Sequence, residues 1–186
     1  MRSLIAAALM LFAGSSLAHA QEACAMEMNV PKLTLTDMWT KSSAKAKAWK
    51  ADAVLARITN TSMGPLDELG KSEAWNLTFF SPSANASVTI STFRGMFTCY
   101  AQPGPAGRLP DVTPLFFHDG AKLYAIAKAQ AGSYLAQGYT ITIGTAAAPG
   151  DRHATWNIQL QKDNTNAPLL ILVDANTGAL EKVIKN

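Results

Sequence analysis

Two short clusters pair a histidine with an acid, and these are the residues whose types and spacing could do chemistry. His118 precedes Asp119, and Asp151 lies two residues before His153. If their loops converged, the imidazoles and carboxylates could ligate a metal ion or form an acid/base pair. A simpler interpretation makes Asp119 a helix N-cap and His153 a surface loop residue. We adopt the simpler one and predict no catalytic residues, no metal site and no cofactor.

The motifs of common enzyme classes are absent from the sequence. It contains no Gly-x-Ser-x-Gly, Cys-x-x-Cys, His-Glu-x-x-His or glycine-rich phosphate loop. The formal net charge is only +3, and the one close group of lysines fits a solvated helix face better than the basic stripe of a nucleic-acid binder. We therefore expect a protein that is not an enzyme and does not bind nucleic acid. That lysine group is Lys41, Lys45, Lys47 and Lys50.

Trp75 and Trp156 are the remaining candidates for a binding site. Each begins a segment in which apolar and polar residues alternate. Core packing is the default use of such residues. If the alternation turned them outward, the two tryptophans would instead be anchors of a partner-binding surface.

The first twenty residues have the pattern of a bacterial signal peptide. Arg2 precedes an apolar core from Leu4 to Ala13, and Ala18-His19-Ala20 has the small-x-small pattern of a cleavage site. The apolar core is too short to anchor a protein in a bilayer, which takes about 20 residues. We expect residues 1–20 to be cleaved, leaving a periplasmic or secreted protein with no stable membrane insertion.

Both cysteines lie after this leader, where an oxidising compartment favours pairing. A Cys24–Cys99 disulfide would hold the N-terminal arm, residues 21–31, against the rest of the fold. An alternative in which Cys24 carries a lipid is disfavoured, because Gln21 and Glu22 are too polar for the approach to a lipidated cysteine.

The first half of the chain is predicted to contain one helix and three strands. Ser42 or Thr36 can cap a helix that includes Ala44–Ile58, in which four apolar residues recur at helical spacing. Period-two alternation then predicts strands near 75–79, 87–93 and 96–100. Residues 102–110 hold three prolines and two glycines and form the best linker. The helical stripe comprises Ala51, Val54, Leu55 and Ile58.

The second half repeats this order of elements. Asp119 caps a helix that Gly138 ends, and residues 139–143 alternate as a strand. A hairpin then pairs 156–161 with 169–173 and closes in a structural turn. In that turn an Asp and an Asn can accept backbone N–H groups and a glycine can take positive φ, whereas a calcium loop would need more oxygen ligands. The turn residues are Asp174, Asn176, Thr177 and Gly178.

Sliding the chain by eighty-one residues aligns the two hairpins without a gap. Each hairpin also follows a helix, with Lys50-Ala51 and Lys128-Ala129 in comparable places. We predict an α+β fold of two tandem helix-plus-antiparallel-sheet units. An arm and the first unit would occupy 21–101, and the second unit 111–186. The identical pairs are Trp75 and Trp156, Asn76 and Asn157, Asn85 and Asn166, Ala86 and Ala167, and Ile90 and Ile171.

The second half resembles the PepSY family of small exported modules over residues 123–183. The resemblance rests on the helix ending near Gly138, the Trp156-x-Ile158-x-Leu160 strand and the closing Val173-Asp174-Ala175-Asn176-Thr177-Gly178. The first half resembles a degenerate copy, with Phe93-Arg94-Gly95 in place of the turn. The resemblance implies a helix packed on an antiparallel sheet, in modules that restrain peptidases, act as propeptides or stand free in the envelope. It brings no catalytic residues.

These observations lead to one main hypothesis for function and two alternatives. The main hypothesis is a PepSY-like protein that binds a protein partner in the cell envelope, as an inhibitor or chaperone of a peptidase, through an open sheet face or an edge strand. One alternative is a carrier of a small apolar ligand between helix and sheet, as in cystatin-like cups. The other is an enzyme or metal site using His118 and His153.

Overall fold

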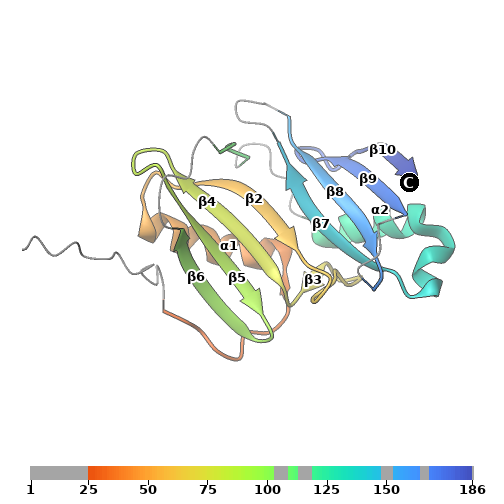
Figure 1. Cartoon of the computed structure of the whole chain (residues 1–186), viewed down its shortest axis with the longest axis horizontal. Coiled ribbons are helices and arrows are strands. Elements are labelled where there is room, and N and C mark those ends of the chain that lie inside the picture. Colours follow the sequence, from red (N-terminus) through yellow and green to blue (C-terminus); the bar gives the residue numbers. More distant parts are fainter. Residues whose placement is uncertain (1–24, 103–108, 113–118, 148–152, 164–167, 186) are drawn as a thin grey trace, which may run out of the picture.

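An eight-stranded antiparallel sheet with two helices on one face forms the body of the protein (Figure 1). The structure is a computed structural model, and it describes residues 25–102, 109–112, 119–147, 153–163 and 168–185. The predicted α+β class is confirmed, while residues 1–20, Cys24 and His118 lie outside the described residues. The elements are β1 (Leu33–Thr34), α1 (Leu35–Trp49), β2 (Val54–Asn60), β3 (Lys71–Ser72), β4 (Trp75–Ser81), β5 (Ala86–Phe93), β6 (Met96–Gln102), α2 (Gly120–Ala131), the 3-10 helix η2 (Gly132–Gln137), β7 (Thr140–Ala146), β8 (Thr155–Gln161), β9 (Leu169–Asp174) and β10 (Leu180–Lys185).

The strand order of the large sheet is β10-β9-β8-β7-β2-β4-β5-β6, so β2 and β7 meet at its centre. A second, two-stranded sheet pairs β1 with β3. Figure 1 shows α1 behind the strands on one side of the β2/β7 junction and α2 behind those on the other. The opposite face of the sheet carries no helix of the described chain. None of the helices in the described residues combines the length and apolar character needed to cross a membrane.

The first helix differs from its prediction at both ends. It begins after Thr34, whose hydroxyl accepts the Asp37 N–H at 3.0 Å, and it ends at Trp49. The predicted continuation to Ile58 is wrong, because residues from Val54 onward form β2. A bulge between Leu55 and Arg57 turns both Leu55 and Ile58 toward the core. The bulge therefore gives this strand the i, i+3 spacing that otherwise indicates a helix.

The second helix begins as predicted, but its α-helical part ends at Ala131, and the predicted Gly138 ends the 3-10 helix that follows. Asp119 accepts the Lys122 N–H at 3.0 Å as the N-cap of α2. The helix passes into η2, which closes at Gly138 with a left-handed φ of 88°. The predicted strands at 75–79, 87–93, 96–100, 156–161 and 169–173 are all present, and the strand predicted at 139–143 is observed as β7.

The central hairpin of each half has the same register. In the β4/β5 hairpin Leu77 lies opposite Ile90, and in the β8/β9 hairpin Ile158 lies opposite Ile171. These pairs are related by the offset of eighty-one residues seen in the sequence. The two hairpins thus share one register.

The helices and the strands after them match at a second offset, of eighty-five residues. It relates the N-caps Thr34 and Asp119 and brings the buried faces of α1 and α2 into the same positions. The predicted equivalence of Lys50-Ala51 with Lys128-Ala129 is wrong, because Lys50 is the C-cap of α1 and Lys128 lies inside α2. The four-residue difference between the offsets lies between β2 and β4. The matched buried residues are Leu35, Met38, Ser42 and Ala46 in α1, and Gly120, Leu123, Ala127 and Ala131 in α2.

Where β2 meets β7, side chains replace most of the usual ladder. One backbone pair, Thr59 with Gly144, joins the two strands. On one side of it the Ile58 N–H donates to Thr145 Oγ1 at 2.9 Å, and on the other the Ile143 N–H donates to Asn60 Oδ1 at 2.6 Å. Asn60 and Thr145 are 5 % and 9 % exposed, so these bonds are shielded from water. We call this junction the seam.

Three further contacts join the two halves. Leu66, in the loop between β2 and β4, donates its N–H to Ile141 O of β7 at 2.9 Å. In the same loop Gly70 packs against Gly120, so that a Cβ on Gly70 would lie 2.3 Å from the Ala121 nitrogen. After the linker the Val112 N–H returns to Leu55 O at 2.8 Å. The buried apolar residues of both halves form one continuous core.

The N-terminal arm is held along the outer edge of β6. Glu27 and Phe97 exchange backbone hydrogen bonds of 3.0 and 2.9 Å. The Glu27 carboxylate also pairs with Lys41 and Lys45 of α1. Cys99 of β6 is disulfide-bonded, and its predicted partner Cys24 lies outside the described residues, so the Cys24–Cys99 pairing stays a prediction.

We predict that Gly70→Ala destabilises the fold more than Gly138→Ala. Both glycines have positive φ, 69° and 88°, so each substitution should cost about 1–2 kcal/mol of backbone strain. Only at Gly70 does the new methyl clash with backbone, whereas at Gly138 its nearest neighbour is the end of the Lys162 side chain, at 3.8 Å. The clash should add roughly 1–3 kcal/mol. Urea unfolding of the two variants measures the difference, and equal losses would contradict the Gly70–Gly120 contact.

We also predict that Thr145→Val weakens the seam while Thr145→Ser largely preserves it. Valine keeps the shape but removes the acceptor of the Ile58 N–H. A buried donor left without a partner costs about 1–3 kcal/mol. Serine retains the hydroxyl and serves as the control. Equal free energies of unfolding for the two variants would show that the hydroxyl does not support the seam.

Candidate functional site

The two tryptophans do not form an exposed site. Trp75 and Trp156 are both 0 % exposed, and the Trp75 indole N–H donates to Leu33 O at 2.9 Å. They lie on the same sheet face as their apolar neighbours, for example Leu77 and Ile158, and that face is covered by the helices. The alternative in which Trp75 and Trp156 anchor a partner is therefore wrong, and they are core residues.

Only part of each histidine cluster lies within the described residues, so the pairing of His118 with His153 stays a hypothesis. His118 and Asp151 lie outside the described residues, and Asp119 is engaged as the cap of α2. His153 instead lies between two acids: its Nδ1 is 3.5 Å from Asp174 Oδ2 and its Nε2 is 3.0 Å from Glu181 Oε1. Ligand atoms of these three residues lie within 4.8 Å of one another. His153 is 58 % exposed, so the group is best described as a surface ion-pair cluster that links the β7–β8 loop to β9 and β10.

Asp174 is engaged mainly in the turn that follows β9. Its Oδ1 accepts the Asn176 and Thr177 N–H groups at 2.8 and 2.6 Å and the Thr177 hydroxyl at 3.0 Å. Gly178 takes a φ of 70° and donates its N–H to Asp174 O at 2.9 Å. The Thr177 N–H, followed by the other donors and the nearby His153, lowers the pKa of the Asp174 carboxyl below its ordinary value. This carboxylate is therefore used to shape backbone.

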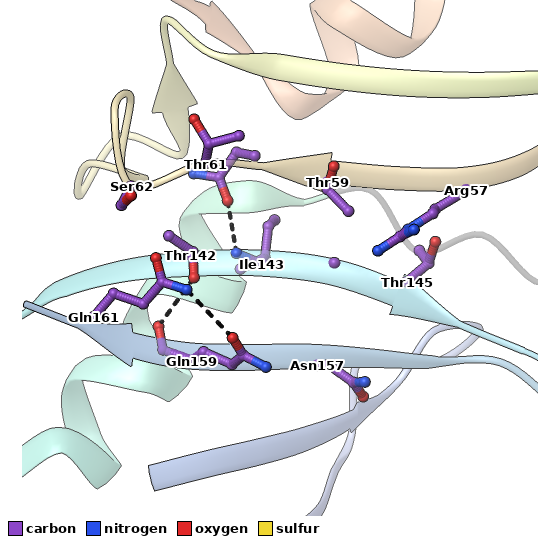
Figure 2. Close-up of a pocket in the computed structure, with 12 residues that line it drawn as sticks. Arg57, Thr59, Thr61, Ser62, Thr142, Ile143, Thr145, Asn157, Gln159 and Gln161 are labelled. Atoms are coloured by element: carbon purple, nitrogen blue, oxygen red, sulfur yellow. Dashed lines mark hydrogen bonds between the residues drawn. The ribbon is translucent and has the colours of Figure 1, made fainter. Parts of the chain in front are cut away.

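A polar groove lies on the open face of the sheet, over the seam (Figure 2). Its volume is about 370 Å³. Hydroxyl and amide side chains from three adjacent strands form its walls, and Gly144 leaves its centre without a side chain. The lining residues are Arg57, Thr59, Asn60, Thr61, Ser62, Thr142, Ile143, Gly144, Thr145, Asn157, Gln159 and Gln161.

Three polar residues of the groove, Thr142, Gln159 and Gln161, are only loosely bonded to one another. Gln161 Nε2 lies 3.5 Å from Gln159 Oε1, and Thr142 Oγ1 lies 3.5 Å from Gln159 O. Both distances are at the long end of hydrogen bonding. These groups can exchange such weak bonds for better ones with a ligand, which makes the groove suited to recognition by hydrogen bonding.

Arg57 is the charged member of the described groove lining. Figure 2 shows it extending from β2 toward β7, beside Thr145. Its side chain is exposed. Among the residues that the structure describes, Arg57 has no ion-pair partner.

The sheet edges are poorer binding sites than this face. The edge strand β10 carries Glu181, Lys182 and Lys185, and charges of this kind oppose strand addition. At the other edge the arm bonds to β6, since Val30 N–H donates to Gly95 O at 2.9 Å in addition to the Glu27–Phe97 pair. Of the two routes expected from the sequence, the open face is therefore favoured over the edge.

A smaller hollow lies between α1 and the sheet, where the carrier hypothesis would place its ligand. Its walls include Trp39, Val54 and Phe79, and its volume is about 220 Å³. Pockets for small molecules usually measure roughly 300–1,000 Å³. This hollow is below that range, so the structure gives the carrier hypothesis little support.

The groove was not predicted from the sequence, although two signals for it were present. Three of the four outward positions of β8 carry amides, Asn157, Gln159 and Gln161. Gly144 interrupts the strand β7 at the position opposite Asn157. Such a row of amides is also what any solvated strand would show, and it becomes a groove wall only because β2 lies beside β7.

No protein-family model matches the chain, and no curated protein matches it either. Among solved structures, a protein from Clostridium difficile 630 described as a putative lipoprotein is similar to it with a TM-score of 0.50 and 14 % sequence identity. The similarity covers 86 % of this chain and 95 % of that one. At this level of identity the likeness concerns the fold.

We predict that Asp174→Ala destabilises the protein at neutral pH by about 1–2 kcal/mol, because the turn loses its acceptor. The pKa of Asp174 is lowered in the folded state, so its contribution is complete above the unfolded pKa of about 3.9. It is lost as the pH falls through the lower folded-state pKa. Urea unfolding should therefore show a gap between wild type and variant that narrows in acid. Asp174→Asn, which keeps one acceptor oxygen, is the control, and a gap that does not depend on pH would contradict the role of the carboxylate.

Proposed function

We propose that this chain is a non-enzymatic exported protein that binds a partner protein through the open face of its sheet, with the groove over the seam as the centre of the interface. The observation that carries the proposal is the groove itself, a hollow of about 370 Å³ with polar walls on the face that the helices leave uncovered. Antiparallel sheets commonly keep one face free in this way.

The chemistry of the open face favours a protein as the occupant. Its central rows hold hydroxyl and amide side chains, such as Asn76 and Thr78 on β4 and Asn157 and Gln159 on β8. These groups both donate and accept hydrogen bonds, so they can bind peptide groups of either polarity. Protein interfaces depend on such bonds at about one per 100–200 Å². The partner class that we propose is a peptidase restrained or chaperoned by this protein, as the PepSY resemblance implies.

We further propose that the fold arose as a tandem of two PepSY-like units. The shared hairpin register, the matched helix faces and the matched caps support a duplication. Each half also has a side-chain hydrogen bond between its hairpin and the segment that follows its α-helix. Ser81 Oγ donates to Asp52 Oδ1 at 2.7 Å, and Lys162 Nζ donates to Gln137 O at 2.7 Å.

The export of the protein is proposed on two grounds. Residues 1–20 have the composition of a cleaved leader, and Cys99 is in a disulfide, a bond that persists mainly in oxidising compartments. The description of the Clostridium difficile protein as a putative lipoprotein agrees with a location in the envelope.

The proposal is tested by capture of the partner with a groove variant as the comparison. The tagged full chain is cross-linked in an envelope extract of the organism that produces it, and the captured proteins are identified. We expect Asn157→Phe, which places a ring in the groove, to lose the partner that wild type retains. Ala125→Phe is the matched control, because Ala125 is exposed on α2, on the covered side of the sheet.

The captured protein is then purified, and its affinity for each variant is measured directly. Asn157→Phe should bind at least about tenfold more weakly, as expected for disruption of an interface centre, and Ala125→Phe should bind as wild type does. A partner that binds both variants equally would place the interface elsewhere. Recovery of a lipid or other small molecule in place of a protein would support the carrier hypothesis.

A further inference from the structure

We infer that the groove selects a partner loop that presents an aspartate or glutamate side chain, and that Arg57 is the residue that determines this specificity. The inference rests on the proposed function, because it names the chemistry of the partner at the same groove. Among the described residues, Arg57 has no acidic side chain as an ion-pair partner.

The charge of Arg57 has no counterpart among the described residues around it. The other described residues that line the groove are uncharged. Four ion pairs join acids and bases of the described residues, and none of these pairs includes Arg57. Glu27 pairs with Lys41 and Lys45, and Asp174 and Glu181 flank His153. A guanidinium that points over a polar hollow and lacks an acid is complementary to a carboxylate supplied from outside.

The hollow beside Arg57 has space for that carboxylate. The Thr59 methyl group lies 3.1 Å from where a Cβ of Gly144 would be, so the space directly over Gly144 is largely filled. The open volume is the groove of about 370 Å³, which both Arg57 and Asn157 line. Asn157 lies on β8, the strand on the far side of β7 from Arg57. A carboxylate in the groove would have the guanidinium on the β2 side and the Asn157 amide on the β8 side.

The groove suits a loop better than an added strand. Its lining comes from β2, β7 and β8, three strands that lie side by side. An occupant that contacts all three must cross the strand direction, whereas an added strand would run along one edge. Within a protein partner, a carboxylate is the side chain that arginine binds best, because its planar fork matches the two oxygens. The occupant is therefore an acidic loop of a folded protein.

The test uses a phage-displayed library of random constrained loops as the probe. Loops are selected on the full wild-type chain and sequenced. We expect an Asp or Glu enriched at one loop position. Such loops should bind Arg57→Glu at least about tenfold more weakly and should bind Lys128→Glu unchanged, since Lys128 is exposed on α2. A second selection on Arg57→Glu should enrich Lys or Arg at the same position.

Asn157→Phe separates failure of the inference from failure of the proposed function. If the selected loops lose binding to Asn157→Phe but show no acidic enrichment and bind Arg57→Glu normally, the groove is a binding site and the role of Arg57 is overturned. If the loops bind Asn157→Phe as well as they bind wild type, or if the library yields no loops, the groove itself is not the interface. Thermal melting of each variant confirms that it is folded before binding is compared.

Discussion

The seam between β2 and β7 is the constraint on which the rest of the structure depends. Two half-sheets meet there through one backbone pair, and the N–H groups on either side would be buried without partners if nothing replaced the missing ladder. Asn60 and Thr145 supply the two acceptors, and they occupy equivalent positions in the two halves. Because an unsatisfied buried donor is costly, this reciprocal arrangement allows a continuous sheet to form from two halves.

The seam also determines what each face of the sheet can do. Both helices pack on the face where the tryptophans and aliphatic residues lie, so that face becomes one core shared by the two halves. The loop between β2 and β4 strengthens the union, with Leu66 bonded to β7 and Gly70 against the start of α2. The other face is left to hydroxyl and amide side chains. This division of faces leaves one apolar side that is covered by helices and one polar side that no helix of the described chain covers.

The groove follows from the way in which the strands join. A glycine at the backbone pair of the seam and amides on the next strand leave a hollow just where the two halves meet, and Arg57 extends over it. The two halves differ at this point, since Thr59 of β2 faces Gly144 of β7. A fold with near-equivalent halves thus has one asymmetric site at its centre, with a single positive charge on one wall.

The sequence by itself determined the local structure: the hairpin registers, the Asp119 cap, the Gly138 helix end and the turn at Asp174 all depend on neighbours a few residues apart. The helix predicted through Leu55 and Ile58 was wrong, because a bulge in a strand produced the same spacing of apolar residues. The sequence also left open whether Trp75 and Trp156 face the core or the solvent. Only the tertiary structure decided that the two halves share one sheet, because the bonds of the seam join residues more than eighty positions apart. The groove, and the place of Arg57 in it, exist only once those distant strands lie side by side.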